Sequence, residues 1–189
     1  MNNHLWVELK KGKQSALLEI YKLNYTDLYN YGMRISHNEE LTRDCIHDLF
    51  TKLWSGNSTI KEARDPKPYM FRMLRWMIID ALKHYSPFVE KNDTELYDPI
   101  LSGEDILIND ETSKEQGERL KTAIENLTNR QKEIIYLRFY GGLNYDEISD
   151  VTAIKYQSVR NIFSKAMKQL RKNFMLQSAL ICTYFDSLY

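Results

Sequence analysis

Apolar residues recur at intervals of three and four positions through much of the first 85 residues of the chain. This spacing places them on one face of an α-helix, so the pattern predicts amphipathic helices that bury that face in a core. Residues 15–36 form the first such segment. Its predicted inward side chains are Leu17, Leu18, Tyr21, Tyr25, Leu28, Tyr29 and Met33.

Two further helices are predicted in this block. Residues 38–54 are expected to turn Leu41, Cys45, Leu49, Leu53 and Trp54 inward and Glu40, Arg43, Asp44, His47, Asp48 and Lys52 outward. In residues 65–85, Asp65 can cap the helix and Pro66 can occupy its first position, where the missing N–H is tolerated. The inward stripe of this third helix is Met70, Met73, Leu74, Met77, Ile78, Ala81 and Leu82.

The third predicted helix has a second face with a different character. Arg72, Trp76, Ile79 and Lys83 follow one another at intervals of four, three and four. Such a row suits unpaired nucleic acid, because cations neutralise phosphates and a flat ring can stack on a base. The alternative interpretation is that Trp76 is an ordinary core residue.

A second block of shorter helices follows in residues 115–189. Two capping boxes mark helix starts, in which a side chain at the helix start and one three residues later exchange hydrogen bonds with the backbone. The pairs are Thr128 with Gln131 and Asn144 with Glu147. Gly141 and Gly142 end the first helix, and a short turn around Ala153 joins the second to a third. This is the spacing of a helix-turn-helix.

The helix after that turn is strongly basic. Residues 155–172 contain six Lys or Arg and no Asp or Glu. Its predicted buried residues are Val159, Ile162, Phe163, Ala166 and Leu170, which leave Gln157, Ser158, Arg160, Asn161, Ser164, Lys165 and Lys168 outside. The second helix of such a pair can enter a DNA major groove, where cations contact phosphates and polar side chains read base edges. The alternative is the solvated face of an amphipathic helix.

Charge separates the two blocks although the whole chain balances 26 basic against 26 acidic residues. Residues 86–114 carry 2 basic and 8 acidic side chains, a net charge of −6, and contain two prolines and a glycine without sustained helical periodicity. This segment is predicted to be a linker, with a short acidic helix docked on either domain as the alternative. The last 17 residues are expected to extend the final helix and pack on their own domain, or to form a partner surface.

Composition agrees with a helical, globular chain. Of 189 residues, 43% are hydrophobic, and only seven Gly and four Pro are available for turns. No apolar run is long enough for a signal peptide or a membrane span, which predicts a cytoplasmic protein without membrane insertion. Cys45 and Cys182 lie far apart within apolar patterns, as buried thiols would. The four histidines lack metal-ligand spacing, and no phosphate-binding loop or nucleophile motif points to an enzyme.

Together these segments resemble a bacterial RNA polymerase sigma factor of the extracytoplasmic-function (ECF) group in the sigma-70 superfamily. Residues 16–36, 44–54 and 66–83 resemble its promoter-melting domain, and residues 127–172 resemble its carboxy-terminal domain. The resemblance implies an all-α fold of two small helical domains: residues 1–85, a linker at 86–114, and residues 115–189 with the helix-turn-helix.

The resemblance also implies a polymerase subunit rather than an enzyme, without metal or cofactor. Its expected partners are core RNA polymerase, promoter DNA in double-stranded and melted form, and an anti-sigma protein. Residues implied to bind core polymerase are Asp44, His47, Asp48, Leu49 and Phe50. Those implied at the melted minus-ten element are Arg72, Arg75, Trp76 and Lys83. Those implied at the upstream minus-thirty-five element are Lys155, Tyr156, Gln157, Ser158, Arg160, Asn161, Ser164, Lys165 and Lys168.

Four residues depart from the family pattern. His47 stands where Gln is usual, and Trp76 stands where Asn is frequent. Ala153 and Lys155 replace the usual turn glycine and small polar cap, which predicts a strained turn. The competing function is a stand-alone helix-turn-helix regulator of duplex DNA, but the first block lacks the pattern of a ligand-sensing or phosphoacceptor domain.

Overall fold

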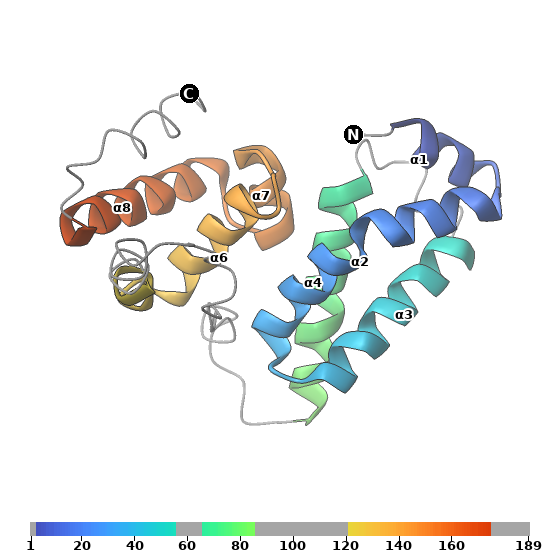
Figure 1. Cartoon of the computed structure of the whole chain (residues 1–189), viewed down its shortest axis with the longest axis horizontal. Coiled ribbons are helices and arrows are strands. Elements are labelled where there is room, and N and C mark those ends of the chain that lie inside the picture. The colour runs from blue at the N-terminus through green and yellow to red at the C-terminus, as the bar shows by residue number, and fades with distance from the viewer. Residues whose placement is uncertain (1–2, 56–65, 86–120, 175–189) are drawn as a thin grey trace, which may run out of the picture.

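The computed structural model describes residues 3–55, 66–85 and 121–174, and the regular secondary structure within these ranges is helical (Figure 1). The helices form two groups, one from each half of the chain, which confirms the predicted all-α fold. Within the three ranges, no helix is long and apolar enough to cross a bilayer. Asp65, the predicted linker at 86–114, Cys182 and the tail beyond Phe174 lie outside the described residues.

The amino-terminal group is a bundle of four helices around one apolar core. These are α1 (Asn3–Lys10), α2 (Gln14–Ser36), α3 (Glu39–Ser55) and α4 (Pro66–Tyr85). Helix α2 contacts each of the other three. The largest side chains buried in this core include Trp6, Leu28, Tyr31, Leu49, Phe71 and Ile78. Helix α4 begins at Pro66, the position predicted for it.

Gly32 on α2 allows three helices to meet closely. A Cβ atom at this position would lie 2.7 Å from Cγ2 of Thr42 on α3 and 3.2 Å from Cδ1 of Ile78 on α4. At the start of α4, Lys67 donates a hydrogen bond to Asp27 of α2 at 2.8 Å, which holds that end of α4 against the bundle. The position and rotation of α4 are therefore set by its packing on α2 and α3.

One predicted helix face is rotated from the observed one, and one residue of a second predicted face points outward instead. On α2, Leu18 and Tyr21 are 55% and 40% exposed, whereas the core face carries Ala16, Ile20, Asn24, Leu28, Tyr31 and Ile35. On α3, Trp54 is exposed rather than inward. The physical reason is that the core face of α2 includes small and polar residues. Asn24, for example, is buried with its amide donating to the Ile20 carbonyl, so hydrophobicity alone does not reveal this face.

Cys45 of α3 is a buried thiol, as predicted. Burial raises its pKa to about 11, and the neighbouring Asp48 and Asp44 add to that shift. The thiolate form is therefore scarce at neutral pH, and Cys45 behaves as a small apolar residue of the core.

The carboxy-terminal group contains α6 (Asn129–Phe139), α7 (Tyr145–Thr152) and α8 (Tyr156–Phe174). Both predicted capping boxes are confirmed. Thr128 accepts from the Gln131 N–H and Asn144 accepts from the Glu147 N–H, while each partner side chain accepts from the backbone N–H of the capping residue. These bonds satisfy backbone donors that a helix start leaves unpaired, so each helix begins where its capping residue stands.

The turn between α7 and α8 is built on a left-handed residue. Ala153 adopts φ 56° and ψ 28°, a conformation that favours glycine because a Cβ atom crowds the following carbonyl. The Ser149 hydroxyl donates to the Ile154 carbonyl at 2.6 Å and holds the turn closed. The predicted strain at Ala153 is therefore present in the backbone.

We expect Ala153→Gly to stabilise the carboxy-terminal domain by about 1 kcal/mol, because glycine removes the left-handed penalty while adding some flexibility to the unfolded chain. Urea unfolding followed by circular dichroism measures this change. Ala81→Gly, inside α4, is the matched control and should destabilise the protein by about 0.5–1 kcal/mol. A destabilised Ala153→Gly variant would mean that the turn carries no strain.

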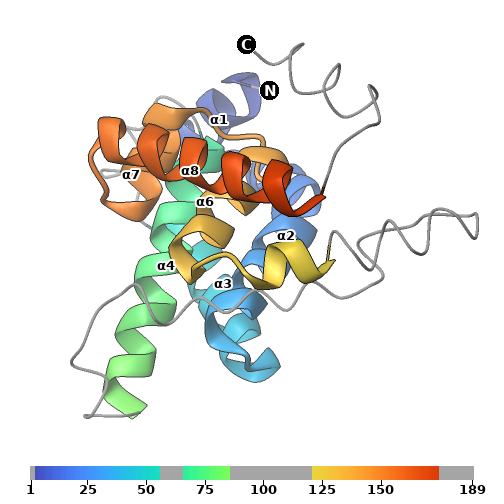
Figure 2. The ribbon, with the colours of Figure 1, turned by 90° about the vertical axis from the view of Figure 1, so that its left-hand side faces the viewer.

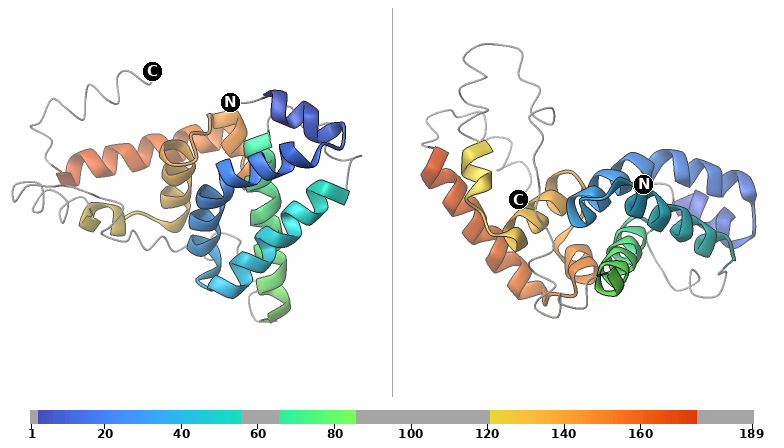
Figure 3. Two further views of the ribbon diagram at one scale, coloured as in Figure 1. Left: turned by 45° about the vertical axis from the view of Figure 1, so that its right-hand side comes forward. Right: turned by 90° about the horizontal axis from the view of Figure 1, so that it is seen from below.

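The two helical groups contact each other through α7, which lies beside α4 in both views of Figure 3. Helix α8 points away from the amino-terminal bundle in Figure 1 and crosses in front of α6 in Figure 2. The described parts of the two domains are therefore docked side by side, and the basic helix α8 lies largely outside the contact.

Candidate nucleic-acid interface

Helix α8 has one buried and one polar face. Val159, Phe163, Ala166 and Met167 are buried, and Ile162 and Leu170 are half-buried. Of the residues predicted to face the upstream element, Ser158 is half-buried. The others are exposed: Lys155, Tyr156, Gln157, Arg160, Asn161, Ser164, Lys165 and Lys168. Because there is no acid between Lys155 and Lys172, every charged side chain on this exposed surface is basic.

Aromatic contacts hold α8 at a fixed angle to α7. The ring of Tyr145, the first residue of α7, meets two rings of α8 edge-on. The ring centroids are 5.5 Å apart for Phe163 and 6.4 Å apart for Tyr156. Arg138 of α6 lies over the Tyr145 ring at 5.3 Å and donates to the Leu143 carbonyl at 3.0 Å. The three helices thus form one rigid unit that presents the polar face of α8, as a helix entering a major groove requires.

Helix α4 exposes an aromatic residue between cations. Trp76 is 60% exposed, so the alternative interpretation of Trp76 as a core residue is wrong. Lys52 of α3 lies over its ring at 5.8 Å, and Arg72, one turn earlier on α4, is also exposed. An exposed indole next to two cations is the arrangement that single-stranded nucleic acid favours. Lys83 is exposed further along the helix.

Two residues near this face lie differently from the prediction. Ile79 is only 7% exposed, because the carboxy-terminal domain covers that side of α4. Arg75 is buried as well, and its Nε donates to Glu133 of α6 at 2.9 Å. A cavity of about 320 Å³ lies between α4 and α7. Its lining includes Arg72, Trp76 and Ile79 from α4 and Asp150, Val151 and Ala153 from α7 and the turn.

The residues expected to contact polymerase divide into two sets. Asp44, His47 and Asp48 are exposed on the outer face of α3. Leu49 is fully buried and Phe50 is 7% exposed beneath Tyr21, whose ring lies 4.9 Å away. Only the first three can contact a partner as the domain stands. Leu49 and Phe50 instead anchor α3 in the bundle and orient those three side chains.

One polar cluster has no counterpart among the sites predicted from the sequence. Glu133 of α6, Tyr31 of α2 and Arg75 of α4 meet at the contact between the two domains. In the sequence, Glu133 looks like a surface residue of a short helix, and Tyr31 belongs to no predicted site. Elsewhere, no three His, Cys, Asp or Glu of the described ranges gather closely enough to hold a metal ion.

The helix-turn-helix, the basic face of α8 and the cationic, aromatic face of α4 define a two-domain helical DNA-binding protein. Comparison with known proteins shows which proteins the chain is similar to. Residues 123–172 match the family model described as "Sigma-70, region 4". The chain is 18% identical over 170 residues to the ECF RNA polymerase sigma factor SigK of Mycobacterium ulcerans, covering 89% of this chain and 91% of that protein.

A second relative is the RNA polymerase sigma factor YlaC of Bacillus subtilis, 21% identical over 164 residues, which cover 85% of this chain and 92% of YlaC. Two solved structures share the fold. One is the structure of CnrH in complex with the cytosolic domain of CnrY (TM-score 0.59, 14% identity, 94% of this chain and 99% of that chain). The other is the sigma factor RpoE with the anti-sigma factor NepR from Bartonella quintana (TM-score 0.55, 16% identity, 85% and 97%). Residues 123–172 therefore carry a sigma-70 region 4 domain, and the relatives that span most of the chain are RNA polymerase sigma factors.

Proposed function

We propose that this protein is a transcription initiation factor that binds core RNA polymerase, directs it to specific promoters and helps to melt the DNA. The observation that carries the proposal is the presence in one chain of two different exposed cationic surfaces suited to DNA, on α8 and on α4. A stand-alone regulator of duplex DNA needs the first surface and has no use for an exposed tryptophan between cations. The relatives in the comparison are sigma factors, which are transcription factors rather than enzymes. We infer that this chain catalyses no reaction itself and acts in the cytoplasm, where polymerase is found.

We assign the contacts by domain. Residues 1–85 would bind core polymerase through Asp44, His47 and Asp48 and contact the melted minus-ten element through α4. Residues 115–189 would read the minus-thirty-five element through α8. The support for this division is that the exposed cations of α4 and α8 lie in separate helical units, which the predicted linker at 86–114 joins. Separate units suit two promoter elements that lie some distance apart on DNA.

An anti-sigma protein is the further partner that we propose. One structural neighbour, RpoE, was solved in complex with an anti-sigma factor, and CnrH was solved with the cytosolic domain of CnrY. This chain shares their two-domain fold. A protein of that kind would restrain this one by occupying surfaces that polymerase or DNA needs.

Transcription in vitro tests the proposed function. We expect the purified chain, added to core polymerase from the same organism and a pool of genomic fragments, to produce run-off transcripts whose start sites share an upstream motif. Core polymerase alone is the control and should give none of these transcripts. Because the upstream surface is only one of two contacts, the chain by itself should shift promoter duplexes weakly. Strong duplex binding without polymerase, together with no new start sites, would favour the stand-alone regulator.

A further inference from the structure

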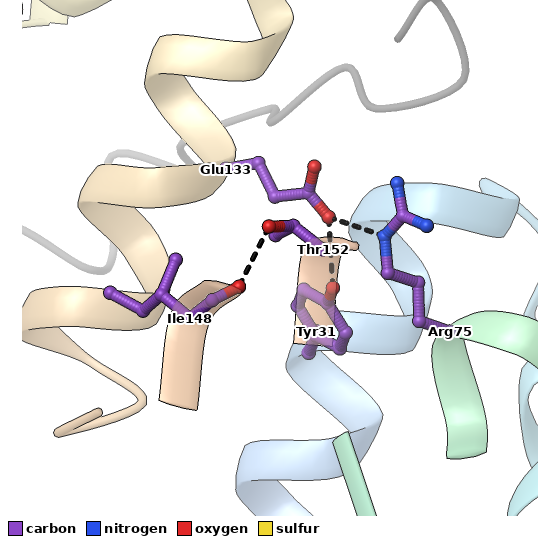
Figure 4. Close-up of polar contacts among 5 residues, drawn as sticks. All are labelled: Tyr31, Arg75, Glu133, Ile148 and Thr152. Atoms are coloured by element: carbon purple, nitrogen blue, oxygen red, sulfur yellow. Dashed lines mark hydrogen bonds and ion pairs between the residues drawn. The ribbon is translucent and has the colours of Figure 1, made fainter. Parts of the chain in front are cut away.

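A buried polar cluster joins the two domains (Figure 4). Oε1 of Glu133, on α6 of the carboxy-terminal domain, accepts a hydrogen bond from the Tyr31 hydroxyl at 2.9 Å. The same oxygen accepts from Nε of Arg75 at 2.9 Å, and the Arg75 and Glu133 side chains are only 10% and 3% exposed. Glu133 lies 102 positions after Tyr31 and 58 positions after Arg75 in the chain. The cluster therefore exists only while the two domains are docked.

An aromatic layer continues this contact one turn further along α6. Tyr136 stacks on Tyr31 with ring centroids 6.0 Å apart and planes 13° from parallel. On α2, the guanidinium of Arg34 lies 4.5 Å from the centroid of the Tyr136 ring. Tyr136 is 6% exposed and Tyr31 is completely buried. The docked surface of α6 therefore combines an ion pair, a hydrogen bond and a cation–π contact.

A contact of this composition can open. When the domains separate, water can solvate both Glu133 and Arg75, so the loss of their ion pair is largely offset by hydration. Interfaces between domains of one chain are typically more polar than permanent ones, and relative motion is the expectation for them. Buried apolar residues of the two domains form one continuous cluster, so undocking also exposes apolar side chains such as Ile79 beside the polar contact.

Docking also takes up one residue of the α4 face that would meet melted DNA, while Arg72, Trp76 and Lys83 of that face stay exposed. Arg75 is one of the four residues implied at the minus-ten element, and here its guanidinium is bonded to a carboxylate. A carboxylate on a guanidinium is the same charge-assisted contact that a backbone phosphate would make. Next to it, α7 covers Ile79 and closes one side of the cavity in which Arg72 and Trp76 lie. A strand of DNA and the docked carboxy-terminal domain cannot both occupy Arg75.

We propose that Glu133 acts as an internal phosphate mimic: in the free protein it holds Arg75, helps to keep the domains docked and withholds Arg75 from the melted-strand surface of α4 until the domains separate. The DNA part of this inference rests on the proposed function of α4, whereas the docking itself does not. Whatever separates the domains then raises the affinity for melted DNA, because the apparent affinity of a site is reduced by the fraction of molecules in which it is open.

Glu133→Gln tests the mimic, with Glu125→Gln as the matched control. Glu125 is an exposed acid of the same domain, so both variants lose one negative charge. We expect Glu133→Gln to enlarge the radius of gyration of the full chain in small-angle X-ray scattering. We also expect it to tighten binding of a fluorescent single-stranded oligonucleotide carrying the minus-ten sequence by on the order of tenfold. The control should match the wild type in both measurements.

Tyr31→Phe provides a second variant that removes only the hydroxyl donor to Glu133 and preserves the ring in the core. It should shift both readouts in the same direction by a smaller factor, and it decides the matter if Glu133→Gln fails to fold. An unchanged radius of gyration in the folded variants would refute the proposal that Glu133 helps to keep the domains docked. A larger radius without tighter oligonucleotide binding would refute the competition with DNA. Absence of promoter-specific transcription by the wild type with core polymerase would instead refute the proposed function, and the scattering result would still stand by itself.

Discussion

Trp76→Ala is expected to weaken open-complex formation by about 1–3 kcal/mol, the range measured when a base loses an aromatic stacking partner. The indole is 60% exposed on α4, with Lys52 over its ring at 5.8 Å. Its removal should leave the unfolding free energy within about 0.5 kcal/mol of the wild type, since substitutions at exposed positions rarely do more. Core binding and upstream recognition should persist, so the variant would form closed complexes that fail to melt.

Permanganate footprinting of promoter DNA, at saturating core polymerase, measures the loss of open complex. A thermal unfolding curve of the same variant measures its stability. Trp54→Ala is the matched control, because Trp54 is a second exposed tryptophan of the same domain and stands on α3 outside the proposed DNA surface. With Trp54→Ala, the permanganate reactivity of the promoter thymines should equal that seen with the wild type. A Trp76→Ala protein that melts promoters normally would show that no base stacks on this ring.

Arg160→Ala and Asn161→Ala should each cost about 1–3 kcal/mol against the preferred minus-thirty-five sequence and relax base preference there. Both side chains are exposed in the first two turns of α8, on the face that the aromatic contacts of Tyr145 hold outward. Guanidinium and amide groups can bond two atoms of one base edge, so their loss removes discrimination as well as affinity. Fluorescence anisotropy with polymerase holoenzyme and single-base promoter variants measures both quantities.

Lys168→Ala separates base reading from phosphate contact. Lys168 is exposed two turns further along α8, and a lysine that contacts phosphate contributes equally to all sequences. Its removal should weaken every promoter by a similar factor and lower the salt dependence of binding by about one unit of slope. If Arg160→Ala and Asn161→Ala gave the same uniform loss, these two residues would be phosphate contacts and the base-reading role would belong to other side chains of α8.

Local chemistry made the carboxy-terminal domain readable from its sequence. Each capping box joins residues three positions apart, so the starts of α6 and α7 could be placed from neighbouring letters alone. The buried and exposed faces of α8 also matched their prediction, because a basic run without acids contrasts sharply with apolar residues at helical spacing. The strain in the turn at Ala153 was also predicted from the sequence, since it depends on one residue type at one place in a short motif.

By itself, then, the sequence determined where α2, α3, α4, α6, α7 and α8 form, which of them carries the basic face, and that two helical blocks are present. Only the tertiary structure decided that Leu18 and Tyr21 face outward, that Phe50 is buried beside Leu49, and that Glu133 bonds both Arg75 and Tyr31. Helical periodicity reports that a face is apolar but cannot report which partner covers it. The side that is buried depends on close approaches such as Gly32 to α3 and α4, and on polar contacts between residues 58 or more positions apart. Such contacts exist only once the whole chain has folded, because their energy depends on exclusion of water by segments that are distant in sequence.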